Sequence, residues 1–484
     1  MTPLLIFLSF LGYTILVFGV TWLTTRKADN ASFFNGNKRS PWAVVAYGMI
    51  GASLSGVTFM SVPGLVGSSG FKYFGVVIGY LLGYTVIATV LLPLYYRLNL
   101  TTIYSYLEKR FGFWSYKTGA FYFLISRTVG ASFRMFLVVN VLQIFVFDAW
   151  GIPFIATVGI FIVLILLYTM KGGIKTIIWT DTLQTTFMLA AVVISLHLIC
   201  KDLGLSFTGL VDQVANSKYS KLIEFDWHAK DFFVKQFFSG AFIAIVMTGL
   251  DQEMMQKNLS CRNLKDAQKN MFSFSFVLIF VNLLFLFLGA ALYMYAGSKG
   301  ITLPERTDDL FPIISINHLG PLAGLVFMIG LISAAYPSAD GALTSLTTSV
   351  SIDFIGLDKK DHLTERQKKK IRYSIHVSFA MVLLAVIVIF RAINDRAVID
   401  KLFTVAGYTY GPLLGLFSFG MFTKRGVHDK WVPLIALGSP VICYILSANS
   451  KVLFSGYTFG FELLILNGFI TYVGLLAISH RQTT

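Results

Sequence analysis

The sequence predicts an all-α membrane protein, because of its composition and the length of its apolar runs. Of its 484 residues, 56% are hydrophobic and 13% are charged, whereas soluble domains carry about 25% charged residues. Many of the apolar runs approach the roughly 20 residues that an α-helix needs to cross a bilayer core. Strands of an outer-membrane barrel would alternate in polarity, but runs such as 163–170 and 276–288 are continuously apolar. We therefore expect helices that span a lipid bilayer.

The first apolar run, Leu4–Leu23, is predicted to be a retained span rather than a signal peptide. No basic residue precedes it, and Arg26 and Lys27 follow it, which is the reverse of a signal-peptide pattern. This polarity predicts an N-terminus outside the cell. In all, thirteen spans are predicted, at residues 3–24, 42–67, 74–96, 118–147, 153–170, 176–200, 236–256, 271–297, 321–352, 373–391, 399–422, 431–447 and 459–479.

The basic residues indicate topology rather than a nucleic-acid surface. The formal net charge is +15, yet the lysines and arginines are dispersed over short loops instead of forming one stripe. With the N-terminus outside, the inner loops and the C-terminal tail hold 25 of the 39 Lys and Arg residues, and the outer loops hold 12. This bias obeys the positive-inside rule. It predicts a cytoplasmic C-terminus and no nucleic-acid partner.

Predicted span 42–67 is rich in residues that interrupt helices. Glycine and hydroxyl residues recur between Gly48 and Gly64, and Pro63 closes the segment. An interior glycine costs about 1 kcal/mol, and an opened helix frees carbonyls that lipid tolerates only where they are buried or line a cavity. The alternative interpretation is close helix packing through small residues. A weaker second interruption is predicted before Asp251, and paired interruptions are typical of inverted-repeat transporters.

Six motifs add a family resemblance over about residues 30–430. They are ASFFNGNKRSPW (31–42), LSGVTFMSVP (54–63), YSYLEKRF (104–111), YTMKGGI with WTD (168–181), DQEMMQK (251–257) and GPLLGLF with FTKR (411–425). In their order and spacing the chain resembles the sodium:solute symporter family, which includes bacterial sodium-coupled sugar, sialic acid and proline carriers.

The resemblance implies a LeuT-type fold of five plus five helices in inverted repeats. The repeats would occupy about 42–200 and 236–422, and the extra helices about 3–24, 431–447 and 459–479. The whole chain, 1–484, would form one transmembrane domain that works by alternating access. We expect a monomer in the bacterial inner membrane that imports a small polar organic solute, such as a sugar, a sugar acid or another organic acid, together with sodium.

A sodium site is implied by the same resemblance. Its ligands would be the backbone carbonyls of Gly51, Leu54 and Ala334 and the hydroxyl of Ser338. The sequence departs from the family pattern at Pro337, where a further hydroxyl residue is usual. A proline removes an i to i−4 hydrogen bond, so the carbonyl of Ser333 could compensate for the lost ligand.

Two carboxylates predict a second cation site. Asp181 and Asp340 both lie in predicted spans, where an ionised group usually faces a partner or a cavity. In the sialic-acid and sugar branches of the family an Asp at the place of Asp181 lies close to the span of Asp340, so the resemblance implies that the two are neighbours. We expect them to flank a cation or to share one proton, since two nearby carboxylates do not both ionise cheaply. The alternative is that Asp181 pairs with Lys175 and that Asp340 bonds a hydroxyl such as that of Thr344.

The resemblance also implies that the solute binds beside the interrupted span. A small polar solute needs hydroxyl and aromatic partners in an enclosed site. In the predicted span 118–147, Arg127 and Arg134 share one helix face and could hold a carboxylate. The alternative is that either arginine pairs with an acid such as Asp148. The predicted solute ligands are Ser53, Ser55, Thr58, Tyr80, Arg127, Arg134, Gln252 and Tyr408, with Tyr410 as a further candidate.

Three rival functions are considered. A proton-coupled or uncoupled carrier on the same fold would follow if Pro337 marks a degenerate sodium site. An integral-membrane enzyme is disfavoured, because no Asp-rich diphosphate-binding motif, His-Glu-x-x-His or Gly-x-Ser-x-Gly is present in the sequence. A channel would carry a recurrent pore-lining signature, and the sequence shows none.

Overall fold

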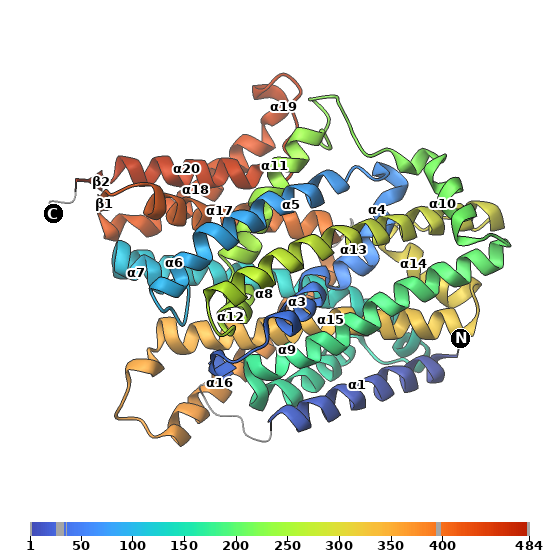
Figure 1. Cartoon of the computed structure of the whole chain (residues 1–484), viewed down its shortest axis with the longest axis horizontal. Coiled ribbons are helices and arrows are strands. Elements are labelled where there is room, and N and C mark those ends of the chain that lie inside the picture. Colours follow the sequence, from blue (N-terminus) through green and yellow to red (C-terminus); the bar gives the residue numbers. More distant parts are fainter. Residues whose placement is uncertain (1, 26–32, 35, 394–397, 482–484) are drawn as a thin grey trace.

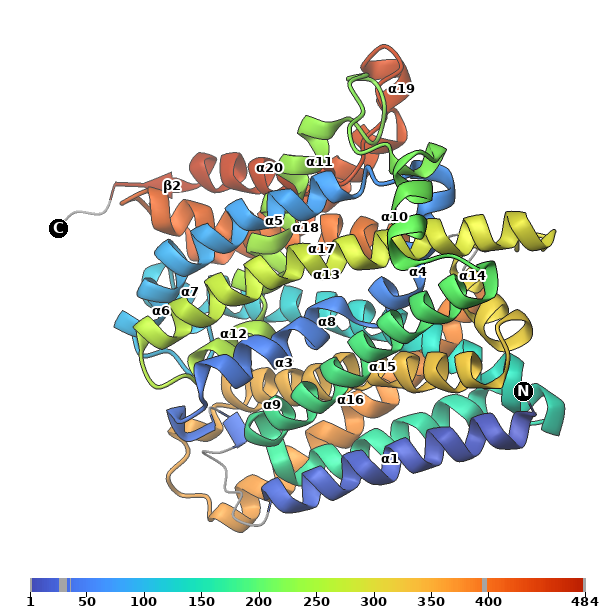
Figure 2. The ribbon, with the colours of Figure 1, turned by 45° about the vertical axis from the view of Figure 1, so that its right-hand side comes forward.

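The protein is a bundle of long helices with its termini at opposite ends. The computed structural model describes residues 2–25, 33–34, 36–393 and 398–481. Helix α1 (Pro3–Thr25) lies on one flank, and α18 (Val432–Ala448) and α20 (Leu463–Ala477) lie on the opposite flank (Figure 1). Figure 2 shows the same arrangement after a 45° turn, with the N-terminus and the C-terminus again at opposite ends.

Each predicted span coincides with a helical segment. Among the described residues, nine helices are long and apolar enough to cross a membrane, or up to eleven with two bent pairs counted as spans. The apolar helices Phe154–Met170 and Leu463–Ala477 are shorter, so the count of thirteen stays a prediction. The remaining elements are α5 (Phe74–Val86), α6 (Leu92–Arg97), α7 (Ser105–Arg110), α8 (Phe113–Leu142), α9 (Phe154–Leu203), α10 (Phe207–Ala215), α13 (Leu264–Lys299), α14 (Leu310–Ile313), α15 (Pro321–Ser349), α16 (Glu365–Ile393), α17 (Val398–Phe422), α19 (Ser450–Leu453) and the antiparallel strands β1 (Gly426–Val427) and β2 (Ser479–His480).

The first predicted interruption is present at Ser55. Helices α3 (Trp42–Leu54) and α4 (Gly56–Ser69) are bent by 55°, and Ser55 has the non-helical angles φ 16° and ψ 175°. Small residues also allow close packing, because a Cβ atom at Gly51 would collide with the Thr185 hydroxyl of α9. The segment therefore combines both interpretations of its composition, an opened helix and a tight helix contact.

The second predicted interruption is sharper. Helix α11 (Phe233–Ala244) and the π-helical turn Ile245–Gly249 are bent by 65° against α12 (Gln252–Leu259). Asp251 caps α12, since its carboxylate accepts hydrogen bonds from the amides of Glu253 at 3.0 Å and Met254 at 3.3 Å. The two breaks thus lie in the first helix of each predicted repeat, as expected for inverted repeats.

Helices α5 and α11 pack backbone against backbone. A Cβ atom at Gly79 of α5 would collide with the carbonyl of Phe237, and one at Gly240 of α11 would collide with the carbonyl of Val76. Each helix therefore uses a glycine to admit the main chain of the other. We call this contact the α5–α11 seam.

Helix α9 is kinked at Gly173, which separates the two predicted spans within it. Gly173 has φ 55° and ψ −156°, and a Cβ atom there would collide with Phe33, so both the angles and the space favour glycine. The second part of α9 packs against α3, and α9 packs most extensively against α15. These contacts bring the helices of Gly51, Asp181 and Ser338 together in the centre of the bundle.

Candidate solute and cation site

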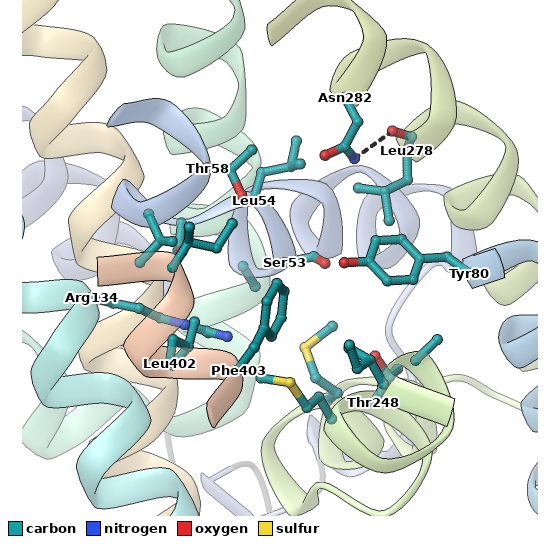
Figure 3. A pocket seen from close by; sticks show the side chains of 18 of the residues that line it. Ser53, Leu54, Thr58, Tyr80, Arg134, Thr248, Leu278, Asn282, Leu402 and Phe403 are labelled. Atoms are coloured by element: carbon teal, nitrogen blue, oxygen red, sulfur yellow. Dashed lines mark hydrogen bonds between the residues drawn. The ribbon is translucent and has the colours of Figure 1, made fainter. Parts of the chain in front are cut away.

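A small cavity lies beside the break between α3 and α4. Its volume is about 70 Å³, and helices α5, α8, α11, α13 and α17 complete its wall (Figure 3). In Figure 3 the hydroxyl of Tyr80 points toward that of Ser53, while Phe403 and Leu402 of α17 lie on another side. The wall therefore combines hydroxyl groups with apolar and aromatic surfaces, as expected for a small-molecule site.

The structure places most of the predicted solute ligands around this cavity. Gln252 lies elsewhere, because its side-chain oxygen accepts from the Ile103 amide at 3.0 Å and its nitrogen donates to the Thr101 carbonyl at 3.1 Å. Tyr408 also lies outside the wall, with its ring 6.3 Å from that of Tyr444 on α18. The predicted residues that line the cavity are Ser53, Ser55, Thr58, Tyr80, Arg127 and Arg134.

Further lining residues were not predicted. Thr248, Asn282, Tyr84 and Phe403 all contribute to the wall. The side-chain nitrogen of Asn282 donates to the Leu278 carbonyl at 2.8 Å, so its side-chain oxygen is left to accept a hydrogen bond from a solute. Asn282 could have been identified from the sequence, since it is an amide within the apolar span 271–297.

The two arginines of α8 have different surroundings. Arg127 is ion-paired with Glu253, and another of its nitrogens lies 3.8 Å from the carboxylate of Asp251. The predicted alternative partner, Asp148, instead interacts with Gln143. Arg134 is 8% exposed, lines the cavity and forms no ion pair with any acid in the described part of the chain. Arg127 is thus neutralised within the protein and Arg134 is not.

The predicted sodium ligands lie on packed helices. The break at Ser55 leaves the carbonyl of Leu54 without the donor that a continuous helix would supply, whereas the carbonyl of Gly51 still accepts from the Ser55 amide at 3.2 Å. Ser338 is fully buried and its hydroxyl has no hydrogen-bond partner among the described residues. Its helix, α15, runs on through Pro337 and packs against both α3 and α4. A buried orphan hydroxyl beside an opened helix fits an oxygen site for sodium.

A cluster of buried charged groups lies between α8, α9, α12 and α15. The ammonium group of Lys257 is 2.7 Å from Asp181 and 3.4 Å from Glu253, and Glu253 in turn pairs with Arg127. The predicted alternative partner of Asp181, Lys175, has a side chain outside the described residues. We call this group the ion cluster, and its members are Arg127, Asp181, Asp251, Glu253, Lys257 and Asp340.

Asp340 joins the cluster through long-range interactions. One of its oxygens accepts from the Tyr168 hydroxyl at 3.0 Å and the other from the Gly341 amide at 2.6 Å. It also interacts electrostatically with Asp181 and Lys257. The proposed hydroxyl partner, Thr344, has no hydrogen-bonded side chain within the described residues. The cationic group in contact with Asp181 is the ammonium group of Lys257.

Comparison with known proteins agrees with this architecture. The sodium/sialic acid symporter NanT of Aliivibrio fischeri is 24% identical over 474 residues, which cover 96% of this chain and 91% of that protein. The sodium/sialic acid symporter SiaT of Proteus mirabilis is 24% identical over 425 residues, which cover 86% and 84% of the two chains. The solved structure of a substrate-bound, outward-open Na⁺-coupled sialic acid symporter matches with a TM-score of 0.80 and 19% identity, over 98% of this chain and 97% of that one.

These matches confirm two predictions, the LeuT-type helical fold and the family. At 19% identity the solved structure supports the fold alone. The family rests on a sequence profile of the sodium:solute symporter family, which matches residues 33–429, most of the chain. This protein therefore belongs to the sodium:solute symporter family, whose members are sodium-coupled membrane transporters and not enzymes.

Proposed function

We propose that this transporter imports a small organic acid together with sodium and holds the acid's carboxylate on Arg134. The observation that carries the proposal is the charge of Arg134, which is buried in the wall of the cavity without an acidic partner among the described residues. A buried charge without a direct ion pair is costly, whereas a bound carboxylate would pair with both arms of the guanidinium. Sialic acid, carried by the two relatives from Aliivibrio and Proteus, is itself a carboxylic acid.

The rest of the cavity suits the remainder of such a solute. Ser53, Thr58, Tyr80 and Thr248 offer hydroxyl groups, and Asn282 offers an amide oxygen. A site built from hydrogen-bonding groups rejects an analogue that lacks the matching group, because the protein's own polar atoms would then stay unpaired. The polar wall therefore supports a hydroxylated acid rather than a purely apolar one.

Uptake into proteoliposomes tests the proposal. Wild-type protein and the variants Arg134→Gln and Arg134→Lys would be assayed with sialic acid, a panel of small organic acids and neutral sugars, under a sodium gradient and under a potassium gradient at fixed pH. Loss of a charge-assisted, two-armed contact is worth about 3 kcal/mol, or about 100-fold in transport efficiency. We expect that loss for the acid in Arg134→Gln and a partial recovery in Arg134→Lys.

Two results would contradict the proposal. Equal uptake of the acid by the wild type and by Arg134→Gln would exclude a carboxylate contact at this residue. Equal uptake under sodium and potassium gradients would instead favour a proton-coupled or uncoupled carrier. The matched control is Gln143→Asn, in the turn that directly follows α8, whose side chain is bonded to Asp148 and Ile152 outside the cavity; it should leave solute selectivity unchanged.

The proposal includes an orientation in the bacterial inner membrane, with the N-terminus outside, the C-terminus in the cytoplasm and a monomeric carrier. The two termini lie at opposite ends of the bundle, and α6 and α7, next to predicted inner basic residues, lie at the end of the C-terminus (Figure 1). The positive-inside rule assigns that end to the cytoplasm. Labelling of single cysteines placed at Leu303 and at Lys360 with an impermeant reagent on whole cells tests this, since only the first should react.

A further inference from the structure

Lys257 is a fully enclosed cation in the centre of the bundle. Its side chain is 1% exposed, and its ammonium group is 2.7 Å from Asp181 of α9 and 3.4 Å from Glu253 of α12. A lysine side chain this deep in a membrane protein is stable only when its charge is paired. The pairing joins α12, the shorter arm of an interrupted helix, to α9, which belongs to the other repeat.

The ammonium group of Lys257 occupies the position beside Asp181 in which a free cation would bind this carboxylate. A small cation requires several oxygen atoms, and Asp181 is the carboxylate available to it on α9. One oxygen of Asp181 is bonded to Lys257, and only the other lacks a partner among the described residues. Asp340 is already hydrogen-bonded through both of its oxygens, to Tyr168 and to Gly341. Three of the four carboxylate oxygens of Asp181 and Asp340 are therefore already engaged.

The charge balance of the ion cluster depends on this lysine. The cluster contains four carboxylates, of Asp181, Asp251, Glu253 and Asp340, and two cationic groups. Without Lys257, Arg127 would be the one cation within the cluster as defined. Carboxylates that lose their counter-charge in a buried site recruit a cation or a proton. Removal of Lys257 thus creates the conditions for a mobile ion to enter.

We propose that Lys257 is a tethered cation that takes the place of a second coupling ion. Its ammonium group neutralises Asp181, so the carrier binds one sodium ion, at the site of Ser338 and the α3 carbonyls, and not two. This inference rests on the proposed sodium-coupled function. A side chain attached to α12 reaches Asp181 without a bimolecular binding step, so it outcompetes free sodium through its high effective concentration.

Equilibrium binding of radioactive sodium to the purified full-length protein tests the inference without a known solute. Binding would be measured to saturation, with choline chloride holding the ionic strength constant. We expect one sodium ion per wild-type protein. Lys257→Met, which replaces the lysine by an unbranched apolar side chain one heavy atom shorter, should double the sodium bound at saturation. Lys257→Met/Asp181→Asn removes both charges and should return the value to one, as should the charge-conserving Lys257→Arg.

Each outcome supports or overturns the inference. Two ions in the wild type would overturn it while leaving the sodium-coupled function intact, and no bound sodium in the wild type would overturn both. A monodisperse Lys257→Met protein that binds one ion would also overturn it. If Lys257→Met does not fold, a second ion bound by the wild type or by Lys257→Arg would still overturn the inference, because it requires one ion in both.

Discussion

Acidification should favour closure of the end of the bundle that carries the N-terminus, and Asp308 should be the residue responsible. Asp308 lies in the turn Thr307–Asp309 between α13 and α14, outside the candidate spans. Its carboxylate is 4% exposed and accepts from the amide of Val398, the first residue of α17, at 3.0 Å. Helix α17 carries Phe403 into the cavity wall, so the contact ties this turn to a helix of the site.

The magnitude follows from the pKa of Asp308. Burial raises this pKa from 3.8 to about 6, Asp309 adds to the rise, and the Val398 amide and Arg306 oppose it. If opening exposes the carboxylate to water, its pKa returns to the ordinary value. The closed state then binds the proton more tightly, so its advantage is full at low pH and is lost as the pH rises through about 6. Between pH 7.5 and pH 5 the closed state gains about 1.4 kcal/mol, or about tenfold in population.

Distances between spin labels at Leu303 and Thr404, both exposed, would report the closed and open populations. We expect the ratio of closed to open protein to rise about tenfold from pH 7.5 to pH 5, and by less than twofold in Asp308→Asn. Asp309→Asn is the comparison variant, since its carboxylate is more exposed and lies 3.8 Å from Arg306; because Asp309 adds to the rise in the pKa of Asp308, it should weaken the pH response without abolishing it. An equal pH response in Asp308→Asn and the parent protein, or a shift toward the open state on acidification, would refute the reasoning.

Three further substitutions have defined outcomes. Ser338→Ala removes the buried orphan hydroxyl and should raise the sodium concentration for half-maximal uptake about tenfold, the effect of losing about one ligand contact; unchanged sodium dependence would place the ion elsewhere. Gly51→Ala should lower stability by about 1–3 kcal/mol through overpacking against Thr185, and thermal unfolding of Gly51→Ala/Thr185→Ala should recover part of that loss. Gln252→Ala should lower thermal stability but leave the half-saturating solute concentration unchanged, because this side chain bonds the 101–103 backbone; a large rise in that concentration would return Gln252 to the solute site.

Local composition was enough to predict the helices and to identify the two segments that break, but for the first segment it left an opened helix and close packing as alternatives. The two helix breaks lie where the sequence marks them, at the glycine and hydroxyl residues around Gly51 and at Asp251. A break of this kind depends on nearby sequence. The cavity wall was largely predicted from the family resemblance, which implied a solute beside the first break, with Ser53, Thr58 and Tyr80 among its ligands. Single spans and their interruptions could thus be predicted without knowing which helices are in contact.

The partners of the charged residues could not be predicted in this way. In the sequence, Lys257 looks like the first basic residue of an inner loop, and 76 positions separate it from Asp181. The 65° bend turns α12 inward between α9 and α15, and this packing gives Lys257 a buried acidic partner. Likewise, Arg127 pairs with Glu253 rather than with Asp148 because of the same bend. Hydropathy carries no information on such contacts between distant helices.

The α5–α11 seam limits how this carrier can move. Two main chains that interlock through glycines cannot slide past each other without steric collision, so α5 and α11 should move as one rigid unit. Relative motion is easier where α12 meets α9, because charged side chains there can exchange partners with incoming water. A covalent cross-link between α5 and α11 should therefore leave the turnover rate of transport unchanged. A cross-link between α12 and α9 should instead stop the transport cycle in one conformation.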